Sequence, residues 1–212
     1  MANALLKVAA AILALVIATP PANALPRGYT GADLIQNCSL DAAVCDVYLR
    51  ALLDGHDTLL VWTQSASRIC PPRSLDAGEL WQLVSARLMA RPERLGASAG
   101  SLVLDALQVA YRCQIAPVAA VPVLTAPQSG VDLASRCTNS ATCEPALIGV
   151  LDAHQTLVDW DRIPRRYACL PDASTLAEWR LVVLKYLGGH LDQLNYSAGS
   201  LTLLAMTEAY PC

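Results

Sequence analysis

The sequence predicts an all-α protein made of two tandem four-helix modules, each held by disulfide bonds and joined by a Pro/Ala-rich linker. Three observations predict this fold: part of the chain occurs twice, apolar residues recur at helical spacing in both copies, and cysteines fall at matching places. The repeat is clearest at 98–102 and 197–201, which both read Ser-Ala-Gly-Ser-Leu. We therefore expect a first module over 25–113, a linker over 114–129 and a second module over 130–212.

The chain starts with features of an export signal. Met1 to Lys7 carries a positive charge, Val8 to Ile17 is an apolar run too short to span a bilayer, and Ala22-Asn23-Ala24 is a small-x-small cleavage site. We expect a signal peptide over 1–24 and a mature protein in the periplasm. A membrane anchor is the alternative, and it is disfavoured by the cleavage site.

Each copy then contains four predicted helices. A short helix starts at Gly31 in the first copy and at Gly130 in the second, and ends near a cysteine. The second helix of the first copy has apolar or small residues at helical spacing from Val47 to Leu59, and its counterpart is expected to begin at 143–145. The proline in that stretch suits the first turn of a helix.

The third helix has the clearest start signal. Asp76 with Glu79, and Thr175 with Glu178, have the spacing of a capping box and precede apolar residues at helical spacing. The fourth helix is expected to follow directly, with Ser98 and Ser197 as N-caps and small residues that allow close packing.

The linker is rich in Pro, Ala and Val, which predicts an extended connector. Docking of Val118, Val121 and Leu124 into a groove is the alternative.

The eight cysteines divide evenly between the copies, and the last two of each copy are 43 residues apart. Small exported domains often depend on disulfides. Four cysteines per copy allow three pairings. We expect all bridges to lie within modules, as Cys38–Cys45, Cys70–Cys113, Cys137–Cys143 and Cys169–Cys212.

Charge excludes one class of partner. Without the predicted signal peptide the chain keeps 14 of its 15 basic side chains against 18 acidic ones, because only Lys7 is removed. This balance gives no electrostatic footprint for nucleic acid. No later apolar run reaches the length of a membrane span, so no membrane contact is expected after cleavage.

The order of motifs in the second copy resembles the Rap/Tai immunity proteins of type VI secretion. These motifs are Cys137 and Cys143-Glu-Pro-Ala-Leu, then Cys169-Leu-Pro, then Ser197-Ala through Ala209-Tyr-Pro-Cys212, and the first copy follows them more loosely. The resemblance implies a helical periplasmic protein that binds and blocks a cognate peptidoglycan amidase. It also implies that the two tandem copies replace a homodimer. The first copy departs from the family pattern at one position, where Arg112 stands in place of the proline before the last cysteine.

No catalytic residue, metal site or cofactor is predicted. Asp54-Gly-His56 and Asp152-Ala-His154 recur at one place, but residues two apart on a helix point to different faces, so a packing role is favoured over a metal or acid–base role. Even pairing of the cysteines argues against a thiolate nucleophile. Trp62 and Trp160 are expected to fill the core.

The loops between the second and third helices are the expected partner-binding surface. Residues 161–168 hold most of the candidate anchors and residues 63–69 hold one, Arg68. The anchors of the second loop are Arg162, Arg165, Arg166 and Tyr167. A solvated charged loop is the alternative at this place. For the whole chain, the alternative function is a periplasmic helical chaperone that binds unfolded clients.

Overall fold

The computed structural model describes residues 28–72, 75–113 and 128–212. The predicted signal peptide and nearly all of the predicted linker, including Val118, Val121 and Leu124, lie outside these residues. The described part is helical, has no strand and contains four disulfides, so the predicted fold class is confirmed. None of its helices is both long enough and apolar enough to cross a bilayer.

The helices follow the same order in both repeats. In the first repeat they are α1 (Gly31–Leu40), α2 (Ala42–Trp62), α3 (Ala77–Met89), the 3-10 turn η1 (Pro92–Arg94) and α4 (Ala99–Ala110). In the second repeat they are α5 (Gly130–Arg136), α6 (Ser140–Asp159), α7 (Leu176–Gly189), the 3-10 turn η2 (Leu191–Gln193) and α8 (Ala198–Ala209).

Side-chain caps fix the start of these helices. The capping boxes of Asp76 with Glu79 and of Thr175 with Glu178 begin α3 and α7 as the sequence predicts. Ser98 and Ser197 cap α4 and α8. Two further capping boxes, of Thr30 with Asp33 and Ser129 with Asp132, begin α1 and α5.

Two local predictions are wrong. A 3-10 turn separates the third and fourth helices of each repeat, so the fourth does not follow directly. Helix α6 begins at Ser140, where Asn139 caps it, so Pro145 lies inside the helix and not in its first turn. The Asn139 side chain supplies the start signal there, and a proline this close to the start removes the backbone hydrogen bond to Ala141.

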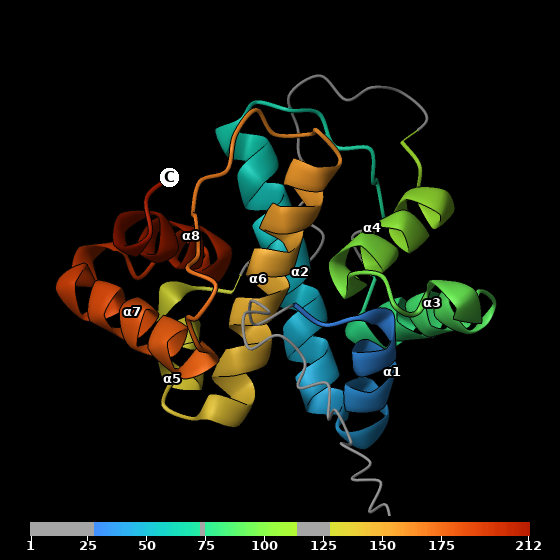
Figure 1. Cartoon of the computed structure of the whole chain (residues 1–212), viewed down its shortest axis with the longest axis horizontal. Coiled ribbons are helices and arrows are strands. Elements are labelled where there is room, and N and C mark those ends of the chain that lie inside the picture. The colour runs from blue at the N-terminus through green and yellow to red at the C-terminus, as the bar shows by residue number, and fades with distance from the viewer. Residues whose placement is uncertain (1–27, 73–74, 114–127) are drawn as a thin grey trace, which may run out of the picture.

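The long helices α2 and α6 form the centre of the molecule. They run side by side, with α1, α3 and α4 on one flank and α5, α7 and α8 on the other (Figure 1). Small residues permit the contact: a Cβ added to Gly149 would meet the Tyr48 carbonyl oxygen at 2.5 Å, and one added to Gly55 would meet the Val150 Cα at 3.0 Å. The core therefore crosses the boundary between the repeats.

The fourth helix of each repeat packs on the central helix of the other repeat. Helix α4 contacts α6, where a Cβ on Gly100 would meet the Asp152 Cβ at 2.9 Å. Helix α8 contacts α2, where a Cβ on Gly199 would meet the backbone of Asp54 at 2.9 Å. The Ser-Ala-Gly-Ser motif thus caps a helix and lets it approach closely, as predicted, but the helix that it approaches belongs to the other repeat.

The two tryptophans at the ends of α2 and α6 also pack against the other repeat. Trp62 packs partly buried against the core of the second repeat, and Trp160 packs against the core of the first. Each side chain therefore belongs to the apolar interior, and each helps to join the two repeats.

Disulfides fasten the ends of each repeat. Cys38–Cys45 and Cys137–Cys143 join the first two helices of a repeat, and Cys70–Cys113 and Cys169–Cys212 join the end of the fourth helix to the segment before the third. These are the expected pairs. The longer bridges stand beside antiparallel backbone pairs, Ile69 with Arg112 and Ala168 with Pro211, so the chain on either side of each bridge is held in place.

Candidate partner-binding site

The two loops expected to bind a partner lie against each other. Nη2 of Arg162 donates to the Ala66 carbonyl oxygen at 3.0 Å, and the Ser65 hydroxyl donates to the Arg162 carbonyl oxygen at 3.5 Å. Loop 63–69 follows α2 and loop 161–168 follows α6, so the parallel course of the central helices brings both loops to one end of the molecule (Figure 1). We call this surface the loop edge.

Backbone geometry holds both loops in the same way. Gln64 and Asp161 have φ of 53°, the left-handed conformation that commonly ends a helix. The next N–H in each loop turns back to a helix carbonyl, from Ser65 to Leu60 at 2.9 Å and from Arg162 to Leu157 at 2.8 Å. Each loop therefore leaves its helix in a fixed direction.

The candidate anchors separate into two groups. Arg68 and Arg162 line one groove, together with Arg112. Arg165 lies over the ring of Tyr167, with its Cζ 5.4 Å from the ring centroid.

Tyr167 is half-buried and connects the loop to the core. Its ring meets Trp62 edge-on, with centroids 5.5 Å apart, and its backbone N–H donates to Nε2 of His154 at 3.0 Å. Arg165 and Arg166 are exposed. Tyr167 thus supports the loop from below. Arg165 lies over its ring, and Arg166 lines the cavity between the repeats that also contains His154.

The groove beside the loop edge has a volume of about 710 Å³. Loop 63–69 forms one wall with Ser67 and Arg68. Gln108 of α4 and Arg112, which follows that helix, form another, and Arg162 enters from the second repeat. Partial burial, together with the charge of Arg68, lowers the pKa of the Arg162 guanidinium below its usual value. The groove therefore concentrates positive charge contributed by both repeats.

A second cavity, of about 310 Å³, lies between the repeats and contains the Asp-x-His motif of α6. Asp152 and His154 both line it, although residues two apart were expected to point to different faces. The carboxylate of Asp152 accepts a hydrogen bond of 2.7 Å from the Tyr48 hydroxyl, across the repeat boundary. Burial raises the pKa of Asp152 to about 7 against the opposing effect of this bond, and burial followed by the charge of Arg166 lowers the pKa of His154 to about 4.

The first repeat uses its Asp-x-His motif differently. Asp54 accepts a hydrogen bond of 2.6 Å from the backbone N–H of Gly199, and burial raises the pKa of Asp54 to about 6. His56 Nδ1 lies 2.9 Å from Asp57. Among the residues that the structure describes, no three His, Cys, Asp or Glu side chains gather as metal ligands. Asp54 and Asp152 therefore each accept a hydrogen bond from the other repeat.

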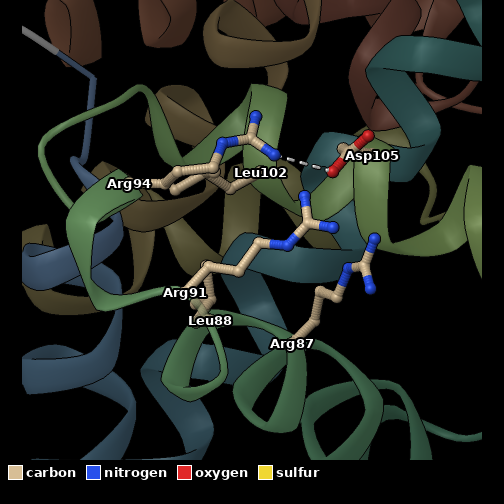
Figure 2. Close-up of a pocket in the computed structure, with 6 residues that line it drawn as sticks. All are labelled: Arg87, Leu88, Arg91, Arg94, Leu102 and Asp105. Atoms are coloured by element: carbon tan, nitrogen blue, oxygen red, sulfur yellow. Dashed lines mark hydrogen bonds and ion pairs between the residues drawn. The ribbon is translucent and has the colours of Figure 1, made fainter.

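A cluster of arginines lies on the first repeat between α3 and α4. Figure 2 shows Arg87, Arg91 and Arg94 extending toward α4, where Arg94 pairs with Asp105 at 3.1 Å. The space between them is only about 10 Å³. It is therefore a packed charged surface and not a ligand cavity.

Sequence reasoning overlooked these arginines and the part that Arg112 plays in the groove. Comparison of the repeats gives the signal, because the second repeat has Pro211 in place of Arg112. In place of the three clustered arginines it has Tyr186, His190 and Gln193. Its Tyr186 and His190 stack, with centroids 4.1 Å apart. Positive charge is thus a property of the first repeat at these places.

The helical body and the four disulfides define a small cross-linked all-α protein with a tandem repeat. The family model of the Rap1a immunity proteins matches residues 30–113 and again residues 129–212. The chain therefore belongs to the Rap1a immunity protein family and carries two copies of the family's repeat. Comparison with curated proteins gave no significant match. Comparison with solved structures gave none either.

Proposed function

We propose that the chain is a periplasmic immunity protein that binds a peptidoglycan amidase delivered by type VI secretion and covers its active site. The observation that carries the proposal is the match of the Rap1a family to both repeats, because immunity proteins of this kind act on a protein effector. Four disulfides favour an oxidising compartment, in agreement with the signal peptide expected over 1–24.

The loop edge is the proposed contact surface. Exposed loops on a cross-linked scaffold suit recognition, because their backbone is ordered before binding and little conformational entropy is lost. Arg165 and Arg166 project from this edge, and arginine is a common interface anchor. Inhibition by occlusion requires no reaction by the immunity protein itself.

The tandem repeat is proposed to replace a homodimer. Reciprocal packing supports this proposal, because α4 lies on α6 and α8 lies on α2, as exchanged elements do in a two-fold dimer. The hydrogen bonds of Tyr48 to Asp152 and of Gly199 to Asp54 cross the same boundary.

A chaperone role receives less support, because the family model that matches both repeats is that of immunity proteins.

The direct test is co-expression in the bacterial periplasm with a candidate amidase, which is sought among the genes that neighbour this one. Cells that carry the export-competent chain should survive induction of the amidase, while cells that carry the chain without residues 1–24 should lyse. Equal lysis with both forms would reject the immunity proposal, and equal survival would reject the proposed compartment.

The loop anchors give a sharper prediction. The double variant Arg165→Ala, Arg166→Ala should weaken amidase binding by more than about 2 kcal/mol, because truncated anchors lose both contact area and charge. Calorimetric titration measures the change. The matched control is Lys185→Ala, an exposed cation on α7 of the same repeat, which should leave the affinity unchanged. Unchanged affinity of the double variant would remove these residues from the interface.

A further inference from the structure

We infer that the groove formed by Arg68, Arg112 and Arg162 is the specificity site for a carboxylate-rich segment of the protein partner, with one such site per chain. This inference rests on the proposed function for the identity of the partner. It goes beyond the family assignment by naming the chemistry that is recognised and the single side of the molecule on which recognition occurs.

None of the three guanidinium groups forms a salt bridge with an acidic side chain in the part of the chain that the structure describes. The salt bridges of the described residues involve other groups, Arg50 with Asp46, His56 with Asp57 and Arg94 with Asp105. The remaining residues, 1–27, 73–74 and 114–127, contain no Asp or Glu. A groove with three cations and no carboxylate of its own attracts an anionic ligand, and arginine binds carboxylates through two parallel N–H donors.

The groove is organised before any partner arrives. The Cys113 backbone N–H donates to the Arg68 carbonyl oxygen at 3.2 Å, and the Cys70 N–H donates to the Tyr111 carbonyl oxygen at 2.7 Å. The Cys70–Cys113 bridge closes the same pair of segments. Arg68 and Arg112 thus stand on a cross-linked backbone, and the Arg162 guanidinium is held by the Ala66 carbonyl oxygen.

None of the three arginines has an arginine at the equivalent position of the other repeat. Arg68 stands two residues before Cys70, where the second repeat has Tyr167 before Cys169, and Arg112 corresponds to Pro211. Arg162 stands two residues after Trp160, where the first repeat has Gln64 after Trp62. The second repeat has Arg165 and Arg166 at the positions of Ala66 and Ser67, but it also has Glu208 at the position of Val109. Only the first of the two equivalent places therefore combines three arginines with no carboxylate among its lining residues.

The second repeat also shows how the charge can be removed without harm to the fold. Pro211 occupies the same antiparallel pair with Ala168 that Arg112 occupies with Ile69. Arg112→Pro is therefore compatible with the backbone and takes away one cation. Arg68→Glu reverses a second, exposed charge at the surface.

The first experiment uses a labelled oligoglutamate peptide and fluorescence anisotropy on the mature full chain. We expect binding that weakens steeply with salt, and a loss of about tenfold or more for Arg68→Glu and for Arg112→Pro. Lys185→Glu carries the same charge reversal as Arg68→Glu outside the groove and should change affinity by less than about twofold. Circular dichroism confirms that each variant is folded.

Equal losses for Lys185→Glu and Arg68→Glu would overturn the inference, because attraction would then follow net charge and not the groove. Tighter binding of a labelled oligothymidylate than of the oligoglutamate would also overturn it, since the groove would then be a nucleic-acid site.

The second experiment separates the inference from the proposed function. If the wild-type chain protects cells from the amidase and Arg112→Pro with Arg68→Glu does not, both statements hold. If the double variant protects equally well, the groove is not the specificity site and the immunity role stands. If the wild-type chain fails to protect while the peptide still binds in the groove, the immunity role fails alone.

Discussion

At the residue scale, the buried Asp152 shows how a repeated motif acquires a structural role. Its carboxyl lies in the interior between the repeats, accepts the Tyr48 hydroxyl and has its pKa raised to about 7 by burial. A buried carboxylate destabilises the folded state unless hydrogen bonds compensate, because water solvates the charge better. The motif that resembles an acid–base pair in sequence thus serves as a polar link between helices.

The raised pKa predicts a pH dependence. The folded state holds the Asp152 proton more tightly than the unfolded state, in which the pKa of this carboxyl is near 3.8. Proton binding by Asp152 therefore stabilises the folded state fully below about pH 4, and this stabilisation is lost as the pH rises through about 7. Asp152→Asn removes the titration. Relative to the variant, the wild-type chain should lose at least about 1 kcal/mol between these limits.

Urea unfolding of both proteins across that pH range measures the difference. His154 titrates in the opposite sense, since its pKa is lowered to about 4, but it is present in both proteins and its effect largely cancels in the comparison. If the free energies of unfolding of the two proteins change equally with pH, ionisation of the buried Asp152 carboxyl does not destabilise the folded state.

At the element scale, the contact of α2 with α6 decides the architecture. Most residues of α2 are buried, among them Tyr48, Leu49 and Leu52, and only a narrow stripe that includes Asp46 and Arg50 is partly exposed. A helix with so wide an apolar face lies at the centre of a fold. The backbone of α2 packs closely against Gly149 of α6. A Cβ at Gly149 would meet the Tyr48 carbonyl oxygen at 2.5 Å and the Leu52 backbone nitrogen at 2.9 Å.

Gly149→Ala should therefore destabilise the chain by about 2 kcal/mol or more, because the new Cβ would press on backbone atoms of Tyr48 and Leu52 that cannot move independently. Gly188→Ala is the matched control. A Cβ at Gly188 meets nothing within 4 Å, so alanine there should raise stability by about 0.5–1 kcal/mol through its better helix propensity. Denaturant midpoints of the two variants check both signs, and a neutral Gly149→Ala would contradict the close contact.

At the scale of the whole molecule, the repeats share their interior. One apolar cluster combines Val47, Leu59 and Leu60 of α2 with the second repeat, and the other combines Ile148 and Ala153 of α6 with the first. Neither repeat encloses a core alone. The molecule is a single packed body that is written twice in the sequence.

A single repeat should therefore seek a partner. We expect the mature chain to be a monomer that unfolds in one transition, and the segment 128–212 expressed alone to form a dimer, in which a second α6 takes the place of α2. Size-exclusion chromatography with light scattering measures both states. A folded monomer of 128–212, or a mature dimer of the whole chain, would contradict the shared core.

The sequence predicts local features of this molecule better than its assembly. Capping boxes at Asp76 and Thr175 and the pairing of Cys38 with Cys45 depend on residues that are close in sequence. The packing of α4 on α6 and of α8 on α2 depends on which of the two central helices each fourth helix meets. The central helices of the two repeats are similar in sequence, so the sequence does not distinguish between them. The wide apolar face of α2, interrupted only by a narrow polar stripe, was the available signal.

The candidate site was predicted in part for the same reason. Arg68 and Arg162 were selected from their loops, but they meet only because α2 and α6 end side by side. Arg112 lies on another element and was noted only as a departure from the family pattern. A groove assembled from three segments has no signature in any one of them.

The most direct test of the account is a titration of the purified amidase with the mature chain while peptidoglycan cleavage is followed. The proposed function predicts that cleavage falls in proportion to added chain and stops at one chain per amidase, because one asymmetric chain is proposed to cover the active site. Cleavage that continues unchanged in the presence of excess chain would contradict the account.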